Sequence, residues 1–183
     1  MGGYCDVENL VTFDRTLLMK KLLIFCLLAC GAVVAHAQSM TFYSMADMVR
    51  LSAGEVDNIL VNSGKFKVND KQIVNGQLLT SYQTIDRNKT PIKGETLITG
   101  AYNTTNNGQH LHTVTYKSIY PEYIYNLIKQ IQGLGYHTTL KGADQVRSIY
   151  IFDNNFYHVT VLMMRDGSVN SVEIRQKELG VEP

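Results

Sequence analysis

The chain has 183 residues, of which 45% are hydrophobic, and it carries 17 Lys and Arg against 16 Asp and Glu, a formal net charge of +1. This length and composition suffice for an ordinary domain with its own hydrophobic core. After residue 37 the charges are scattered, without a basic stripe or a charged block. This distribution argues against a nucleic-acid partner and against a basic membrane-binding arm.

The first distinctive segment begins at an internal methionine, Met19. Two lysines follow it, then an uncharged apolar run over residues 22–35, which ends in the small-residue site Ala35-His36-Ala37. This order is typical of a secretory signal peptide, and it predicts cleavage between Ala37 and Gln38. The run is shorter than the roughly 20 residues of a transmembrane helix, so an anchor is the less favoured alternative. We therefore expect residues 1–18 to precede the true start, 19–37 to be the signal peptide and 38–183 to be the mature domain.

A second interpretation of the same segment is lipidation. The sequence Leu27-Leu28-Ala29-Cys30 resembles a bacterial lipobox, in which Cys30 would carry the lipid and anchor the protein to a membrane. The residues after Cys30 remain apolar, however, and this favours soluble export to the periplasm or medium. All three cysteines, at positions 5, 26 and 30, precede Gln38, so the mature chain has neither a disulfide nor a thiol nucleophile.

Helical spacing of apolar residues marks the segment from Ser44 to Gly64. Two capping-box patterns, Ser44 with Asp47 and Ser52 with Glu55, allow either two short helices or one bent helix. A later helix is predicted to begin at Pro121, which suits the first helical position, and to end at Gly133 and Gly135. One apolar face of this helix is formed by Ile124, Leu127, Ile128, Ile131 and Leu134.

The remaining segments alternate with period two, which predicts strands. Short turns rich in Asn, Asp and Gly separate several of them and indicate antiparallel neighbours. Threonines 80, 84, 96, 99, 113 and 115 suggest a wetted face on the first strands. The predicted strands are 78–85, 95–102, 110–119, 136–140, 147–152, 156–164 and 168–175.

The order of elements predicts an α+β fold with helices packed on one face of an antiparallel sheet. In both halves a helix is followed by a glycine and an aromatic residue and then by strands. This order suggests tandem repeats over 44–119 and 120–176. A single domain without duplication is the alternative. The element order, with Leu51-Ser52-Ala53-Gly54-Glu55-Val56 entering a helix that ends at Gly64, resembles the β-lactamase inhibitor proteins and the small periplasmic proteins grouped with them. That resemblance implies protein binding or envelope assembly and supplies no functional residues.

Two sets of residues are candidate sites. His110 and His112 lie two apart on a predicted strand, so their side chains share a face of that strand. They are the candidate metal ligands, and a third ligand could be His137, His158 or a carboxylate.

Three tyrosines, Tyr120, Tyr123 and Tyr125, surround the start of the second helix. They cannot all face one core, so we expect at least one to be exposed and the helix rim to be a candidate interface.

The chain lacks a nucleophile elbow, a dinucleotide loop and a convergent pair of carboxylates. We therefore expect no catalytic residue and no cofactor. The favoured function is an exported bacterial, non-enzymatic module that binds a protein or peptide in the cell envelope. The alternative is a metal-dependent enzyme or metal-binding factor that uses His110 and His112.

Overall fold

A computed structural model of the protein describes residue 20, residues 38–74 and residues 76–178. The chain divides into two compact units, Met1–Ala37 and Gln38–Pro183, and the helices and strands described below belong to the second. Except for Lys20, the predicted signal peptide lies outside the described residues, as do Cys30, Ala35 and Ala37. Among the described residues, no helix is both long and apolar enough to cross a membrane.

Two short helices begin the second unit, α2 (Phe42–Met48) and α3 (Ala53–Asn62). The capping box predicted for α3 is present, because the Ser52 N–H donates to the Glu55 carboxylate at 2.8 Å and the Ser52 hydroxyl accepts from the Glu55 N–H. The capping box predicted at Ser44 is wrong. Thr41 caps α2 instead, and its hydroxyl accepts from the Ser44 N–H at 3.2 Å, since the helix begins at the apolar residue Phe42.

The third helix, α4 (Pro121–Gly133), begins at the predicted proline. Its apolar stripe is buried at Ile124, Leu127, Ile128 and Ile131. In space, α2 packs against α4 and against the strand His110–Ser118 (β4), and α3 packs against the strands Phe66–Val74 (β1) and Pro91–Thr104 (β3). Helix α4 packs against β4 and against the strands Tyr157–Met164 (β7) and Asn170–Gln176 (β8).

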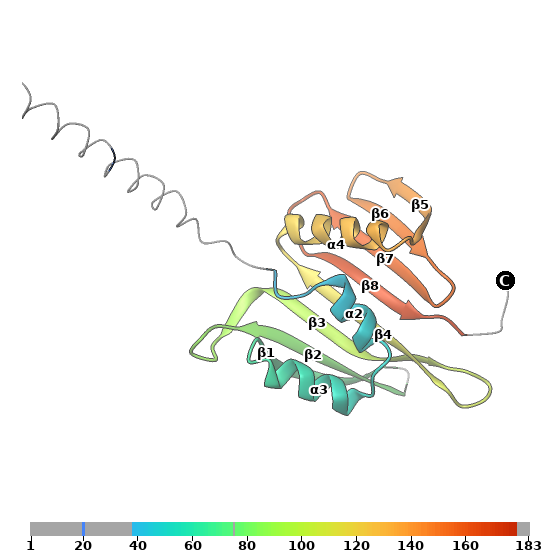
Figure 1. Cartoon of the computed structure of the whole chain (residues 1–183), viewed down its shortest axis with the longest axis horizontal. Helices are drawn as coiled ribbons and strands as arrows, with labels where there is room; N and C mark the ends of the chain where they lie inside the picture. The colour runs from blue at the N-terminus through green and yellow to red at the C-terminus, as the bar shows by residue number, and fades with distance from the viewer. Residues whose placement is uncertain (1–19, 21–37, 75, 179–183) are drawn as a thin grey trace, which may run out of the picture. The chain divides into compact units, whose positions relative to one another are not determined.

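The strands of the described residues join one antiparallel sheet of eight, in the order β1-β2-β3-β4-β8-β7-β6-β5 (Figure 1). The four strands before α4 therefore form one side of the sheet and the four after it form the other. β4 and β8 pair where the two sides meet, with Val114 opposite Ile174 and Tyr116 opposite Val172. The strands are β1 (Phe66–Val74), β2 (Gln77–Ile85), β3 (Pro91–Thr104), β4 (His110–Ser118), β5 (His137–Ala143), β6 (Arg147–Asp153), β7 (Tyr157–Met164) and β8 (Asn170–Gln176).

The α+β class and the antiparallel sheet are confirmed, and β1 is an additional strand. Its sequence, FKVNDKQIV, is largely polar and lacks a sustained alternation. It lies at the edge of the sheet, with β2 as its partner and a register shift between Val68 and Asp70. Only Phe66 of this strand is buried, which explains why hydrophobic patterning did not predict it.

Alternate side chains of the strands form a core with the buried residues of all three helices. Tyr82 on β2, Leu97 on β3, Tyr116 on β4 and Val159 on β7 are each 0–1% exposed. The prediction of a wetted threonine face is wrong for four residues, because Thr80, Thr84, Thr99 and Thr113 are buried. Thr80 and Thr99 are cross-strand neighbours, and Tyr82 and Leu97 occupy the next core-facing positions on the same two strands.

Candidate functional site

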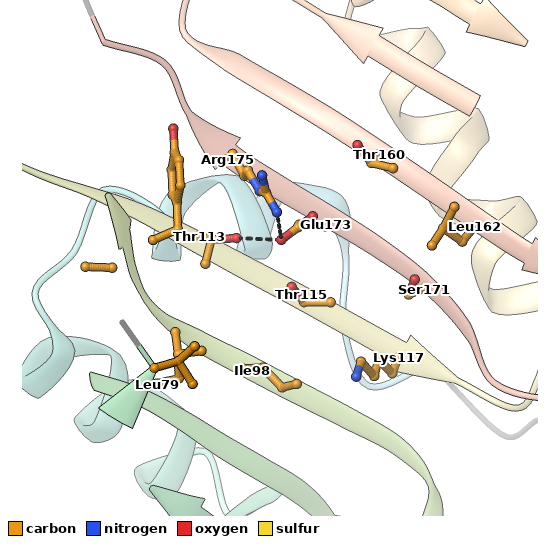
Figure 2. A pocket seen from close by; sticks show the side chains of 13 residues that line it. Leu79, Ile98, Thr113, Thr115, Lys117, Thr160, Leu162, Ser171, Glu173 and Arg175 are labelled. Carbon is orange, nitrogen blue, oxygen red and sulfur yellow. Dashed lines mark hydrogen bonds and ion pairs between the residues drawn. The ribbon is translucent and has the colours of Figure 1, made fainter. Parts of the chain in front are cut away.

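The strand side chains that alternate with the core residues line a depression of about 450 Å³ on the sheet (Figure 2). Leu79, Ile98 and Leu162 contribute aliphatic surface. Thr115 lies on β4, between the strands of Ile98 and Leu162, and Thr160 lies on β7 with Leu162. Each of these five side chains is half-buried. The complete lining is Val74, Leu79, Ile98, Ala101, Tyr102, Thr113, Thr115, Lys117, Thr160, Leu162, Ser171, Glu173 and Arg175.

A charged pair lies near the centre of this depression on β8. The guanidinium of Arg175 is 3.1 Å from the Glu173 carboxylate, and the Thr113 hydroxyl donates to the same carboxylate oxygen at 3.4 Å (Figure 2). Thr113 and Arg175 are register partners on β4 and β8, so the pairing of these two strands brings the three groups together. The result is a polar cluster within a partly aliphatic surface.

Tyr102 completes this polar cluster from β3. The Arg175 guanidinium lies 5.2 Å from the centre of the Tyr102 ring, within the range of a cation–π interaction. The Tyr102 hydroxyl donates to the carbonyl of Gln176 at 2.6 Å. Burial raises the pKa of Tyr102 above its usual value, so this hydroxyl keeps its proton at neutral pH.

These groups can form several kinds of contact with a bound molecule. The hydroxyls of Thr113, Thr115, Thr160 and Ser171 supply hydrogen-bond donors and acceptors. The single hydroxyl proton of Thr113 can be donated to the Glu173 carboxylate, at 3.4 Å, or to the Ile174 carbonyl, at 3.2 Å. The arrangement offers a partner apolar contact area, hydrogen bonds and both signs of charge.

The predicted metal ligands lie at a different depression, of about 160 Å³, which both His110 and His112 line together with Met48, Leu51 and Val56. Nδ1 of His112 is 3.0 Å from the Leu51 carbonyl. Since that oxygen can only accept, Nδ1 carries the proton and Nε2 of neutral His112 keeps its lone pair. A histidine that donates one ring N–H to a carbonyl is typical of metal ligands.

His110 has a different hydrogen-bond arrangement. Its Nδ1 is 3.0 Å from the Thr104 hydroxyl oxygen, which also accepts from the Gln77 side-chain amide at 3.0 Å. Since a hydroxyl oxygen can accept two hydrogen bonds, Nδ1 of His110 accepts from Thr104 in one neutral tautomer and donates to it in the other. Metal binding through Nε2 requires the tautomer in which Nδ1 donates.

The structure does not bring the suggested third ligands to this pair. Nδ1 of His158 is 3.0 Å from Asp153 on β6, and His137 begins the edge strand β5. Among the residues that the structure describes, no group of three or more His, Cys, Asp or Glu side chains is arranged to hold a metal ion.

The three candidate interface tyrosines occupy different environments. Tyr125 is 53% exposed, in agreement with the expectation that at least one would be. Tyr120 is half-buried and packs against the core, with its ring centre 5.2 Å from that of Tyr123. Tyr123 is only 6% exposed, so it supports the core, and the accessible aromatic surface of this rim is mainly that of Tyr125.

Sequence reasoning did not select Glu173, Arg175 or Tyr102. Period-two alternation already places Ser171, Glu173 and Arg175 on one face of a strand. It does not show that β4 pairs with that strand and that β3 lies on the far side of β4, and this strand order creates the cluster.

No protein-family model matches the chain, and comparisons with curated proteins and with solved structures also return no match.

Proposed function

We propose that this protein is an exported, non-enzymatic module that binds a protein or peptide partner of the bacterial cell envelope. The observation that carries the proposal is the depression on the sheet, where Leu79, Ile98 and Leu162 surround hydroxyl groups and the Glu173–Arg175 pair. A mixture of aliphatic area with satisfied polar groups resembles a protein interface. The strand hydrogen bonds fix these side chains in place, so a partner meets a surface that is already ordered.

Two architectural features belong to the same proposal. The three helices cover one face of the sheet and leave the depression on the other, because the helices share their core with only one set of alternating strand residues. The two halves of the sheet are tandem repeats over 44–119 and 120–176, a duplication supported by the sheet order with β4 and β8 at the centre. Both features resemble the layout of the β-lactamase inhibitor proteins.

The proposed location follows from the segment before the compact unit. Cleavage after Ala37 would release residues 38–183 into the periplasm or the medium, and the compact unit begins at Gln38. Lipidation at Cys30 is the alternative, which would tether the same domain to a membrane. The N-terminal residue of the exported protein, measured by mass spectrometry, distinguishes the two.

Partner capture from an envelope fraction tests the binding surface when it is combined with matched variants. Leu162→Arg places a long cation on the sheet depression, whereas Ile59→Arg makes the same kind of change on α3, where Ile59 is 51% exposed. We expect Leu162→Arg to weaken partner binding about tenfold or more and Ile59→Arg to leave it unchanged.

A third variant tests the helix rim. Loss of binding in Tyr125→Ala, with Leu162→Arg still active, would assign the interface to the rim of α4 instead of the sheet. Circular dichroism of each variant checks that it is folded. Failure to recover a specific partner, or a partner that binds all three variants equally, would contradict the proposed surface.

The second candidate function is metal binding by His110 and His112. It is favoured by their shared depression and by the free Nε2 of His112. Calorimetric titration with zinc and with copper tests it, and His112→Asn should abolish the binding, while His137→Asn should not. Absence of saturable binding in the unmodified protein would rule this candidate out.

A further inference from the structure

The start of the compact unit is held firmly on the sheet. The Ser39 N–H donates to the Glu95 carboxylate at 3.2 Å, and the Ser39 hydroxyl donates to the same oxygen. The Tyr116 hydroxyl, from a fully buried side chain on β4, also donates to this oxygen. Three hydrogen bonds therefore converge on one carboxylate oxygen of Glu95, and they fix the backbone immediately after Gln38.

Gln38 itself has an unusual side chain. Its amide nitrogen, Nε2, is buried and has no hydrogen-bond partner among the residues that the structure describes. It is the only such side-chain nitrogen or oxygen in that part of the chain. A buried hydrogen-bond donor without an acceptor destabilises the folded state, so the burial of Nε2 needs a physical reason.

We propose that Gln38 is a modification site and that, as the mature N-terminus, it cyclises to pyroglutamate. The inference rests on the proposed export, because cleavage after Ala37 must first free the α-amino group of Gln38. It explains the unpartnered Nε2, because cyclisation removes that atom from the protein. The next residue stays anchored, since neither the Ser39 N–H nor its hydroxyl takes part in the reaction.

The reaction requires only atoms already present in Gln38. Its α-amino nitrogen attacks the side-chain carbonyl carbon Cδ, and a new N–Cδ bond closes a five-membered lactam. The Cδ–Nε2 bond breaks, and Nε2 leaves as ammonia after taking a proton from the α-amine. No oxidant, reductant or other reactant is consumed. The products are a neutral lactam in place of a charged terminus, and free ammonia.

Mass spectrometry of the exported protein tests this proposal. The full precursor is expressed in a bacterium, and the N-terminal peptide of the exported form is sequenced. We expect a chain that begins at Gln38 and is lighter than its sequence by the mass of one ammonia molecule. Gln38→Asn is the matched control, because it keeps a terminal amide but would need a strained four-membered ring to cyclise. Its α-amine should stay free.

The possible outcomes distinguish cyclisation of Gln38 from cleavage after Ala37. A chain that begins at Gln38 with its amine and amide intact overturns cyclisation but leaves export and cleavage standing. A chain that begins at any other residue overturns both cyclisation and cleavage after Ala37. Thermal unfolding gives a second measurement on the cyclised and freshly prepared amine forms. We expect a higher melting temperature for the cyclised form. Equal melting temperatures would show that cyclisation does not relieve an unfavourable burial of Nε2.

Discussion

At the scale of single residues, one polar cluster ties helix α3 to the sheet. The Tyr82 hydroxyl on β2 donates to the Asp57 carboxylate on α3, and the Lys71 ammonium on β1 lies 3.2 Å from the same group. The Tyr82 hydrogen bond and the Lys71 charge lower the pKa of Asp57, although burial opposes them. Burial and the adjacent carboxylate raise the pKa of Tyr82 far above its usual value. The donor therefore stays protonated and the acceptor ionised at neutral pH.

Tyr82→Phe should lower the free energy of unfolding by about 1.5–3 kcal/mol at pH 7, because it removes a hydrogen bond to a charged group. Urea denaturation measures the change. Tyr125→Phe is the matched control, since that side chain is 53% exposed, and it should alter stability by less than about 0.5 kcal/mol. Equal effects of the two variants would show that the Asp57 contact contributes no net stability.

The same variant has a predictable pH dependence. The pKa of Asp57 is lower in the folded than in the unfolded protein, so its ionised form contributes stability above the unfolded value, and this contribution is lost as the pH falls through the folded value. The difference in the free energy of unfolding between the unmodified protein and Tyr82→Phe should therefore be constant near neutral pH and should shrink below about pH 4. A constant difference across this range would assign the effect to packing rather than to Asp57.

At the scale of elements, the close approach of β2 and β3 depends on a glycine. A Cβ added at Gly100 would overlap the Leu78 carbonyl oxygen and would lie 2.7 Å from the Leu79 side chain. The oxygen belongs to the backbone of the neighbouring strand, so a side-chain rotation cannot relieve this contact. The sequence reveals a glycine in a predicted strand but does not reveal what lies beside it.

Gly100→Ala should therefore destabilise the protein by about 1–3 kcal/mol through overpacking. Gly133→Ala is the control, because an added Cβ there meets no atom within 4 Å and the residue ends α4. That variant should be neutral or more stable by up to about 1 kcal/mol. Thermal unfolding of both variants checks this, and a tolerated Gly100→Ala would mean that β2 and β3 separate at little cost.

Element prediction succeeded where the signal was local. The Ser52–Glu55 box, Pro121 at the start of α4 and the turn around Asp166 and Gly167 each involve residues within a few positions of one another. The cap of α2 at Thr41 was missed because Ser44 offered an equally good local pattern. The edge strand β1 was missed because most of its stability comes from pairing with β2 rather than from burial.

At the scale of the whole molecule, both halves of the sheet share one core. Leu97 and Tyr116 from the first half pack in the same cluster as Phe152 and Val172 from the second, together with residues of α2, α3 and α4. Such a core cannot be divided at the β4–β8 pair without exposing large side chains on both sides. The two halves of the sheet are therefore not expected to fold independently.

We expect residues 38–183 to unfold in a single cooperative transition. Circular dichroism reports the loss of sheet and helix, and tyrosine fluorescence reports side-chain environments, because this region has ten tyrosines and no tryptophan. The two probes should give coincident denaturation curves. Two separated transitions would show that the halves are energetically independent units.

The sequence by itself determined the α+β class, the antiparallel pairing at short turns, the apolar face of α4 and the absence of cysteine after residue 30, because these follow from local spacing and composition. Only the tertiary structure decided that β4 lies beside β8, that Thr80, Thr84 and Thr99 are buried, and that Thr113, Glu173 and Arg175 meet at the depression on the sheet. The physical reason is that alternation assigns side chains to two faces of a strand without saying which face meets the helices. The neighbours of a strand depend on packing between segments distant in the chain.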